Sequence, residues 1–202
     1  GITIGDNQYP ASIFNLWTES ERNAIGIYSV EIDSSNKKDE AWYNNTGITY
    51  AYDSSAKKVK GTYGTAIAKA HADTLYTDDD VSKDVYPDDY TYASMRGKRR
   101  NTWVAGDVAI KGLKSLLIDQ VKAEAQEELS KTDWYVTRKA DTDEAIPSSI
   151  ATHRAAVRTK QASMETSITN ASDTPALQTL FTYTTNSDTG AVTRPIGEIP
   201  KL

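Results

Sequence analysis

Two histidines are the side chains of this sequence best suited to acid–base chemistry near neutral pH. His71 and His153 are far apart, and neither is flanked by the serine or acidic residues of a nucleophile motif. The sequence contains no cysteine, which excludes disulfides, thiolate catalysis and thiolate metal sites. It also lacks the G-x-S-x-G elbow, the phosphate-binding loop and the dinucleotide-binding glycine pattern. We therefore predict a protein that is not an enzyme and uses no cofactor.

An acidic run offers the remaining metal chemistry. Asp78–Asp80 are followed by Asp84, Asp88 and Asp89, and calcium prefers carboxylate oxygens. The run lacks the alternating acidic spacing and the distant glutamate of an EF-hand loop. Blocks of like charge usually form solvated loops. The sequence favours such a loop, and we predict no metal site.

Aromatic and basic side chains gather in the same stretch, residues 76–106, which has neither a helical nor a strand period. Long segments of this kind are commonly functional or disordered. Tyrosine, tryptophan and arginine favour protein interfaces, which we prefer to the alternative of glycan stacking. The predicted partner-binding residues are Tyr86, Tyr90, Tyr92, Arg96, Arg99, Arg100 and Trp103, together with Ile196, Ile199 and Leu202 near the C-terminus.

Composition limits the class of partner. The 202 residues have a net charge of −5 at pH 7, which argues against a general nucleic-acid binder. The basic run Arg96–Arg100 makes only a small electrostatic footprint. No apolar stretch approaches the ~20 residues that span a bilayer, and no secretion signal is visible. We expect a soluble chain with neither a nucleic-acid nor a membrane partner.

The elements that must position these residues change in type along the chain. The front is rich in aromatic and β-branched residues. We predict a short helix over 11–23, a strand over 25–32, and a hairpin of strands 48–53 and 58–63 around a polar turn. Gly64–Leu75 is rich in alanine and is predicted to be helical. The front thus forms a small module with an antiparallel sheet.

The back of the chain is predicted to be helical. Apolar spacings of three and four predict a helix from Asp107 to about Lys131. A second helix is predicted to begin near Pro147, and a third to run from Asp173 to Phe181. The solvent side of the first helix is expected to contain Glu124, Glu127 and Glu128.

The C-terminal residues 183–202 are expected to form an extended tail that docks on a neighbouring surface. The predicted fold class is therefore α+β, with a small antiparallel sheet in the N-terminal half and a helical hairpin in the C-terminal half. The predicted domains are a module 1–75, an excursion 76–106, a helical module 107–182 and the tail 183–202.

Four short runs within residues 113–168 form a pattern: Leu116-Leu117, Thr132-Asp133-Trp134, Ala145-Ile146-Pro147 and His153–Arg158. The pattern resembles the C-terminal region of tailed-bacteriophage tail assembly chaperones and tail-fibre assembly proteins. His153 replaces the usual aromatic residue and Val157 the usual leucine. The resemblance implies other phage tail or fibre proteins as partners, and a place in the virion after assembly in the host cytoplasm. Its motif residues are Thr132, Asp133, Trp134, Pro147, Arg154 and Arg158.

Elementary chemistry gives these motif residues a structural role as well. Thr132 and Asp133 are capping types that can start a new helical turn, and Trp134 is expected to wedge between two helices. Arg154 and Arg158 lie one turn apart, where they can bind carboxylates such as Asp133, Asp141 or Asp143, or those of a partner. A hairpin locked in this way explains the motif without any partner. Function would then lie in the front module, the excursion and the tail.

The long front and the excursion depart from the small assembly chaperones, which favours a protein that stays in the particle. We predict a non-enzymatic structural or assembly component of a phage tail or tail fibre, forming a homo-oligomer because virion components repeat by symmetry. The alternatives are a receptor- or glycan-binding adhesin at a fibre tip and a capsid decoration protein. An adhesin should expose a tyrosine cluster, whereas an assembly protein should bury it against a partner.

Overall fold

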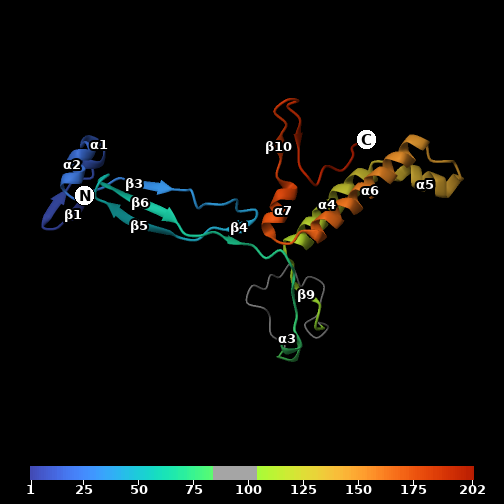
Figure 1. Ribbon diagram of the computed structural model, residues 1–202, viewed down its shortest axis with the longest axis horizontal. Helices are drawn as coiled ribbons and strands as arrows, with labels where there is room; N and C mark the ends of the chain where they lie inside the picture. The colour runs from blue at the N-terminus through green and yellow to red at the C-terminus, as the bar shows by residue number, and fades with distance from the viewer. Residues whose placement is uncertain (84–103) are drawn as a thin grey trace. The chain divides into compact units, whose positions relative to one another are not determined.

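The computed structural model describes residues 1–83 and 104–202, which form two compact units, Gly1–Ala68 and Lys69–Leu202. The N-terminal unit consists of strands and two short helices, and the C-terminal unit is mainly helical (Figure 1). The predicted α+β class is confirmed, with small antiparallel sheets in the N-terminal half and helices in the C-terminal half. The boundary falls after Ala68, inside the predicted 1–75 module.

The N-terminal unit opens with a hairpin of β1 (Ile2–Ile4) and β2 (Asn7–Tyr9), followed by α1 (Ile13–Leu16) and α2 (Glu19–Ala24). The single helix expected over 11–23 is thus two helices. The division arises at Thr18, whose hydroxyl accepts from the Glu21 N–H while the Glu21 carboxylate accepts from the Thr18 N–H. Such a capping box starts a new helix.

The main sheet of this unit has three strands in the order β3 (Val30–Asp33), β6 (Lys58–Tyr63) and β5 (Ile48–Asp53). β5 and β6 form the predicted antiparallel hairpin, and β3 joins β6 in parallel. β3 begins later than the strand expected over 25–32, because α2 extends to Ala24 and Gly26 turns the chain with a φ of 85°. A further pair joins β4 (Tyr43–Asn44) to β7 (Ile67–Ala68).

The prediction of a helix over Gly64–Leu75 is wrong. This segment supplies β7 and then β8 (Thr74–Leu75), which pairs antiparallel with β9 (Val108–Ile110). Two strand pairings with distant segments override the helix propensity of alanine, which is only a weak preference. His71 therefore lies between two strands and not in a helix.

The predicted excursion leaves and rejoins the fold at the β8–β9 pair. Its described part contains α3 (Asp78–Lys83), where Thr77 and Asp80 cap the first turn reciprocally. Tyr76 is buried against Ala109, next to the partly buried Val81 and Ile110. Asp78–Asp80 thus open a helix, where negative charge is favourable, and do not form the expected loop. Residues 84–103 lie outside the described residues.

The C-terminal unit is organised around the predicted helical hairpin, which is confirmed. α4 (Leu113–Ser130) and α6 (Ser148–Asn170) run antiparallel, since Lys114 bonds the Thr169 carbonyl at one end and Arg154 bonds the Leu129 carbonyl at the other. Between them, α5 (Asp133–Thr142) extends the new turn expected at Thr132–Asp133. α6 begins after Pro147, as predicted, and α7 (Thr174–Phe181) is capped by Asp173. The buried core includes Val121, Ala125, Val157, Met164, Ile168 and Leu177.

The start of α4 differs from the prediction. The helix begins at Leu113 and not at Asp107, because residues 108–110 form β9. Its first N–H groups, of Leu113 and Lys114, donate to the Ala70 and His71 carbonyls, each at 3.0 Å. The Asp73 carboxylate accepts from the Gly112 N–H and the Ser115 hydroxyl, both at 2.7 Å. Gly112 is required here, because a Cβ would lie 2.2 Å from the Ala72 carbonyl oxygen.

The tail begins as a hairpin of β10 (Thr184–Thr185) and β11 (Val192–Thr193), and its last residues are extended. Ile196 and Ile199 are only 3% exposed. The Ile196 backbone bonds the Leu180 carbonyl and the Lys160 ammonium of its own chain. The prediction that these two isoleucines bind a partner is therefore corrected: both belong to the core. Leu202 is exposed.

Candidate functional site

Three residues of the resemblance motif, Thr132, Asp133 and Arg154, meet at the corner where α4 ends and α5 begins. Nη1 of Arg154, on α6, donates to the Leu129 carbonyl at 2.7 Å, the Thr132 hydroxyl at 2.7 Å and the Asp133 carboxylate at 2.9 Å. Thr132 stands at the N-cap of α5, but its hydroxyl donates to the Leu129 carbonyl and does not cap the helix. Arg154 is 7% exposed, so these bonds are largely shielded from water.

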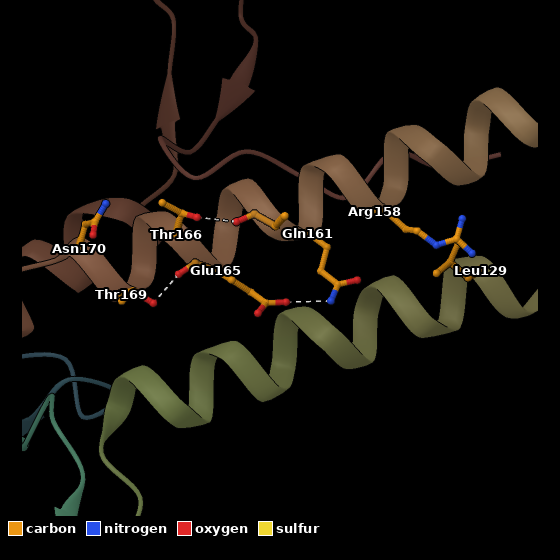
Figure 2. A pocket seen from close by; sticks show the side chains of 8 residues that line it. Leu129, Arg158, Gln161, Glu165, Thr166, Thr169 and Asn170 are labelled. Carbon is orange, nitrogen blue, oxygen red and sulfur yellow. Dashed lines mark hydrogen bonds between the residues drawn. The ribbon is translucent and has the colours of Figure 1, made fainter.

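Arg158 does not join this cluster, although it lies one turn along α6 from Arg154. It is exposed and lines an open groove of about 700 Å³ on the hairpin. Figure 2 shows Arg158, Gln161 and Glu165 pointing from α6 toward α4, with a hydrogen bond of 2.8 Å between the last two. The expectation that both arginines bind carboxylates on one side is confirmed for Arg154 alone, which selects Asp133 from the three candidates.

Beside Arg154 lies a carboxylate that sequence reasoning placed on the wrong side of the helix. Glu128 is expected on the solvent side of α4 but is 0% exposed. One carboxylate oxygen lies 3.2 Å from His153 Nε2 and accepts from the Leu202 N–H at 2.7 Å, while the other pairs with Lys131. The spacing of Val121, Ala125, Glu128 and Thr132 is the signal that identifies its buried position.

The charge of Glu128 is stabilised inside the fold. The hydrogen bond from the Lys131 ammonium lowers the pKa of the Glu128 carboxyl below its ordinary value of 4.5, against the opposing effect of burial. The Leu202 N–H lowers this pKa further. Glu128 and His153 have the residue types of an acid–base pair, but neither is among the residues lining the groove at Arg158. Their contacts join the final residues of the tail to the helical hairpin.

Trp134 is not wedged between helices as expected, since it is 59% exposed on α5. The Arg138 guanidinium lies 4.9 Å from the Trp134 ring centre and 5.4 Å from that of Tyr135, and the two rings are 5.6 Å apart. We call Trp134, Tyr135 and Arg138 the α5 aromatic patch. Sequence reasoning missed Arg138, although its position four residues after Trp134 places both on one side of a helix.

The patch is fixed at both ends of α5. Asp133, the first residue of the helix, bonds Arg154, and Arg138 pairs with Glu144 at 3.2 Å just beyond the helix. Asp143 ends α5 in a left-handed conformation with a φ of 58°. These two ion pairs thus hold the helix that presents the exposed Trp134 ring.

The other predicted partner-binding residues lie outside the described residues: Tyr86, Tyr90, Tyr92, Arg96, Arg99, Arg100 and Trp103. Within residues 1–83 and 104–202, no three His, Asp or Glu side chains gather in a way that would hold a metal ion. No helix in the described part of the chain is long and apolar enough to cross a bilayer. The chain matches no protein-family model, and no curated protein and no solved structure is significantly similar to it.

Proposed function

We propose that this chain is a non-enzymatic structural or assembly component of a bacteriophage tail or tail fibre. It acts through contacts with other tail or fibre proteins and with copies of itself, and its place is in the virion. The phage assignment is supported by the motif resemblance, whose residues Thr132, Asp133 and Arg154 are in contact in the fold. The contact role is supported by the α5 aromatic patch.

The α5 aromatic patch is the single observation that carries the contact role. Tryptophan, tyrosine and arginine are the residue types that most often dominate the free energy of protein association. Here all three lie on one short helix that is fixed at its first residue by a buried arginine. Binding by such a preorganised surface loses less conformational entropy than binding by a loose one.

A protein partner suits this patch better than a glycan. The Arg138 guanidinium lies over both rings and occupies ring faces on which a sugar would stack. A guanidinium can donate two parallel hydrogen bonds to a carboxylate of a protein partner, and a neutral sugar has no carboxylate. The second candidate, an adhesin at a fibre tip, is favoured by a different observation, the exposure of Tyr50 and Tyr52 in the N-terminal unit.

Mass spectrometry of particles purified from infected cells tests the proposal. We expect the chain in the particles at a fixed ratio to the other tail proteins. Trp134→Ala should lower its incorporation by at least about tenfold, because hot-spot residues contribute about 2 kcal/mol or more. The control is Val136→Ala, an exposed position on the other side of the same helix. A chain absent from the particles would contradict the virion role and favour a transient chaperone.

A further inference from the structure

The three-stranded sheet of the N-terminal unit has two chemically different faces. Neighbouring residues on paired strands point to the same side of a sheet. The registers place Val30 beside Val59 and Tyr52, and they place Ile32 beside Gly61 and Tyr50. We call this side the apolar sheet face; it consists of Val30, Ile32, Ile48, Tyr50, Tyr52, Val59, Gly61 and Tyr63.

Gly61 at its centre confirms the arrangement. A Cβ on Gly61 would lie 2.7 Å from Ile32 Cδ1, 2.8 Å from Tyr50 Cε1 and 3.0 Å from Ile48 Cγ2. The side chains of three residues on the two outer strands therefore lie over the glycine. The result is one continuous apolar surface that crosses all three strands.

The opposite face of the sheet is charged and already paired. Lys60 Nζ lies 2.8 Å from the Asp53 carboxylate, and Lys58 Nζ lies 3.5 Å from that of Glu31. The Lys60 ammonium is the largest cause that lowers the pKa of the Asp53 carboxyl. Alternation of this kind is typical of a sheet with one face in water and the other buried.

The apolar sheet face, however, is not covered by any other element of the N-terminal unit. Val30, Ile32, Tyr50 and Tyr52 are all exposed, Tyr50 by 61%. Tyr28 packs on Tyr52 at one end only, with 4.4 Å between the ring centres. Single exposed apolar residues are normal, but a contiguous patch marks an interaction surface.

The absence of charge on the apolar sheet face and the availability of a second copy of the chain indicate which molecule covers this face. The apolar sheet face contains no charged residue, so it offers nothing to a charged partner, and no like charges oppose each other when two such faces meet. A contact around a two-fold axis requires this self-compatibility. In addition, Ile13 and Tyr43 are the only buried apolar side chains of the N-terminal unit, so burial of the apolar sheet face would add to a small core. A second copy is always available.

The area also suffices. The four exposed side chains present roughly 400 Å², on the scale of about 150–250 Å² for a fully exposed ring. Their half-buried neighbours bring one copy to roughly 500 Å². Two copies thus bury about 1,000 Å², the size at which a contact becomes a specific interface.

We infer that the apolar sheet face is the contact between two copies of this chain, with the two sheets packed face to face about 10 Å apart. The inference rests on the self-association included in the proposed function and assigns a surface to it. We expect substitutions on this face to raise the dissociation constant of the dimer, and substitutions on the charged face of the same sheet to leave it unchanged.

Light scattering over a dilution series of the full chain tests the inference. The wild type should have twice the monomer mass of 22.2 kDa at high concentration. Tyr50→Glu and Val30→Glu should each raise the dissociation constant by about 30-fold or more, because a buried carboxylate opposes its copy across the axis. The matched control is Ala51→Glu, on the same strand but the opposite face. Far-ultraviolet circular dichroism verifies that each variant is folded.

A monomer at every concentration would overturn the inference. An oligomer whose mass is unchanged by both Tyr50→Glu and Val30→Glu would also overturn it, while leaving the tail or fibre role intact. Conversely, a dimer dissociated by these variants, formed by a chain that is absent from purified particles, would support the inference and contradict the proposed function.

Discussion

The two units of this chain achieve burial in different ways. In the C-terminal unit, Val121, Val157 and Ile168 are buried between helices of the same unit. In the N-terminal unit, Ile13 and Tyr43 are the only buried apolar side chains, and other large apolar residues such as Leu16 and Tyr50 remain in water. The difference follows from architecture: two helices bury their apolar stripes against each other, whereas a single sheet needs a second layer.

The charged residues differ between the units in the same way. Arg154 and Glu128 are buried in the C-terminal unit, where their hydrogen bonds join α4, α5, α6 and the end of the chain. In the N-terminal unit, the pairs Lys60–Asp53 and Lys58–Glu31 lie on the wet face of the sheet. Exposed pairs of this kind contribute little stability, usually below about 1 kcal/mol. The C-terminal unit is therefore stabilised by contacts in its own interior, whereas the stability of the N-terminal unit depends on a partner that covers its sheet.

The largest difference between the units should come from core truncation. Ile168→Ala should reduce the free energy of unfolding of the helices by about 3–4 kcal/mol, because it leaves a cavity in a packed interior. At a concentration at which the chain is a monomer, the matched change Ile32→Ala, on the apolar sheet face, should alter this free energy by less than about 0.5 kcal/mol. Urea titration followed by circular dichroism at 222 nm measures both. Equal losses for the two variants would break the contrast between the units.

Next in size is the loss of Arg154. Arg154→Met should cost about 3 kcal/mol, because the buried Leu129 carbonyl and Thr132 hydroxyl lose a charged donor. Arg158→Met removes the same group one turn away at an exposed position and should cost less than about 0.5 kcal/mol. The same urea titration compares them. Equal losses of unfolding free energy for the two variants would contradict the stabilising role of the Arg154 hydrogen bonds.

The pH dependence of the C-terminal unit should reveal Glu128. Because its pKa is lowered in the folded state, its stabilising contribution is fully present above pH 4.5 and is lost as the pH falls through the lowered value. Wild type should therefore exceed Glu128→Gln in stability at pH 7, and the gap should narrow below pH 4.5. Glu127→Gln, at the exposed neighbouring position, is the control. A gap independent of pH would contradict the buried charge.

The smallest effect on stability is expected at the α5 aromatic patch. Trp134→Ala should change the free energy of unfolding by less than about 0.5 kcal/mol, since the ring is mostly in water. Thermal unfolding measured by circular dichroism checks this value. A large loss would mean that the ring supports the hairpin, and its lowered incorporation into particles would then have a structural cause.

Local signals in the sequence were sufficient for several elements. Pro147 fixed the start of α6, Asp173 capped α7, and the polar turn between residues 53 and 58 identified the β5–β6 hairpin. Each of these depends on residues within one or two turns of the chain, which a single sequence displays directly.

Other elements depend on distant partners that a single sequence does not display. The start of α4 at Leu113 is held by Ala70 and His71, whose carbonyls accept from its first N–H groups, and by Asp73, 39 residues before Gly112. β8 forms because β9 pairs with it across the excursion. Glu128 was predicted to face solvent because it is charged, although its spacing from Val121 and Ala125 places it on the buried side of α4. Its partners His153 and Leu202 come from elsewhere in the chain.

Hydrogen exchange of the intact chain at two concentrations tests most directly the claim that the two units differ in self-sufficiency. Backbone amides of α4 and α6 should be strongly protected at low and high concentration alike. Amides of β3, β5 and β6 should gain protection as the concentration rises, because a second copy covers the apolar sheet face. Equal protection of the sheet and the helices at the lowest concentration would contradict the account, since the N-terminal unit would then be stable without a cover.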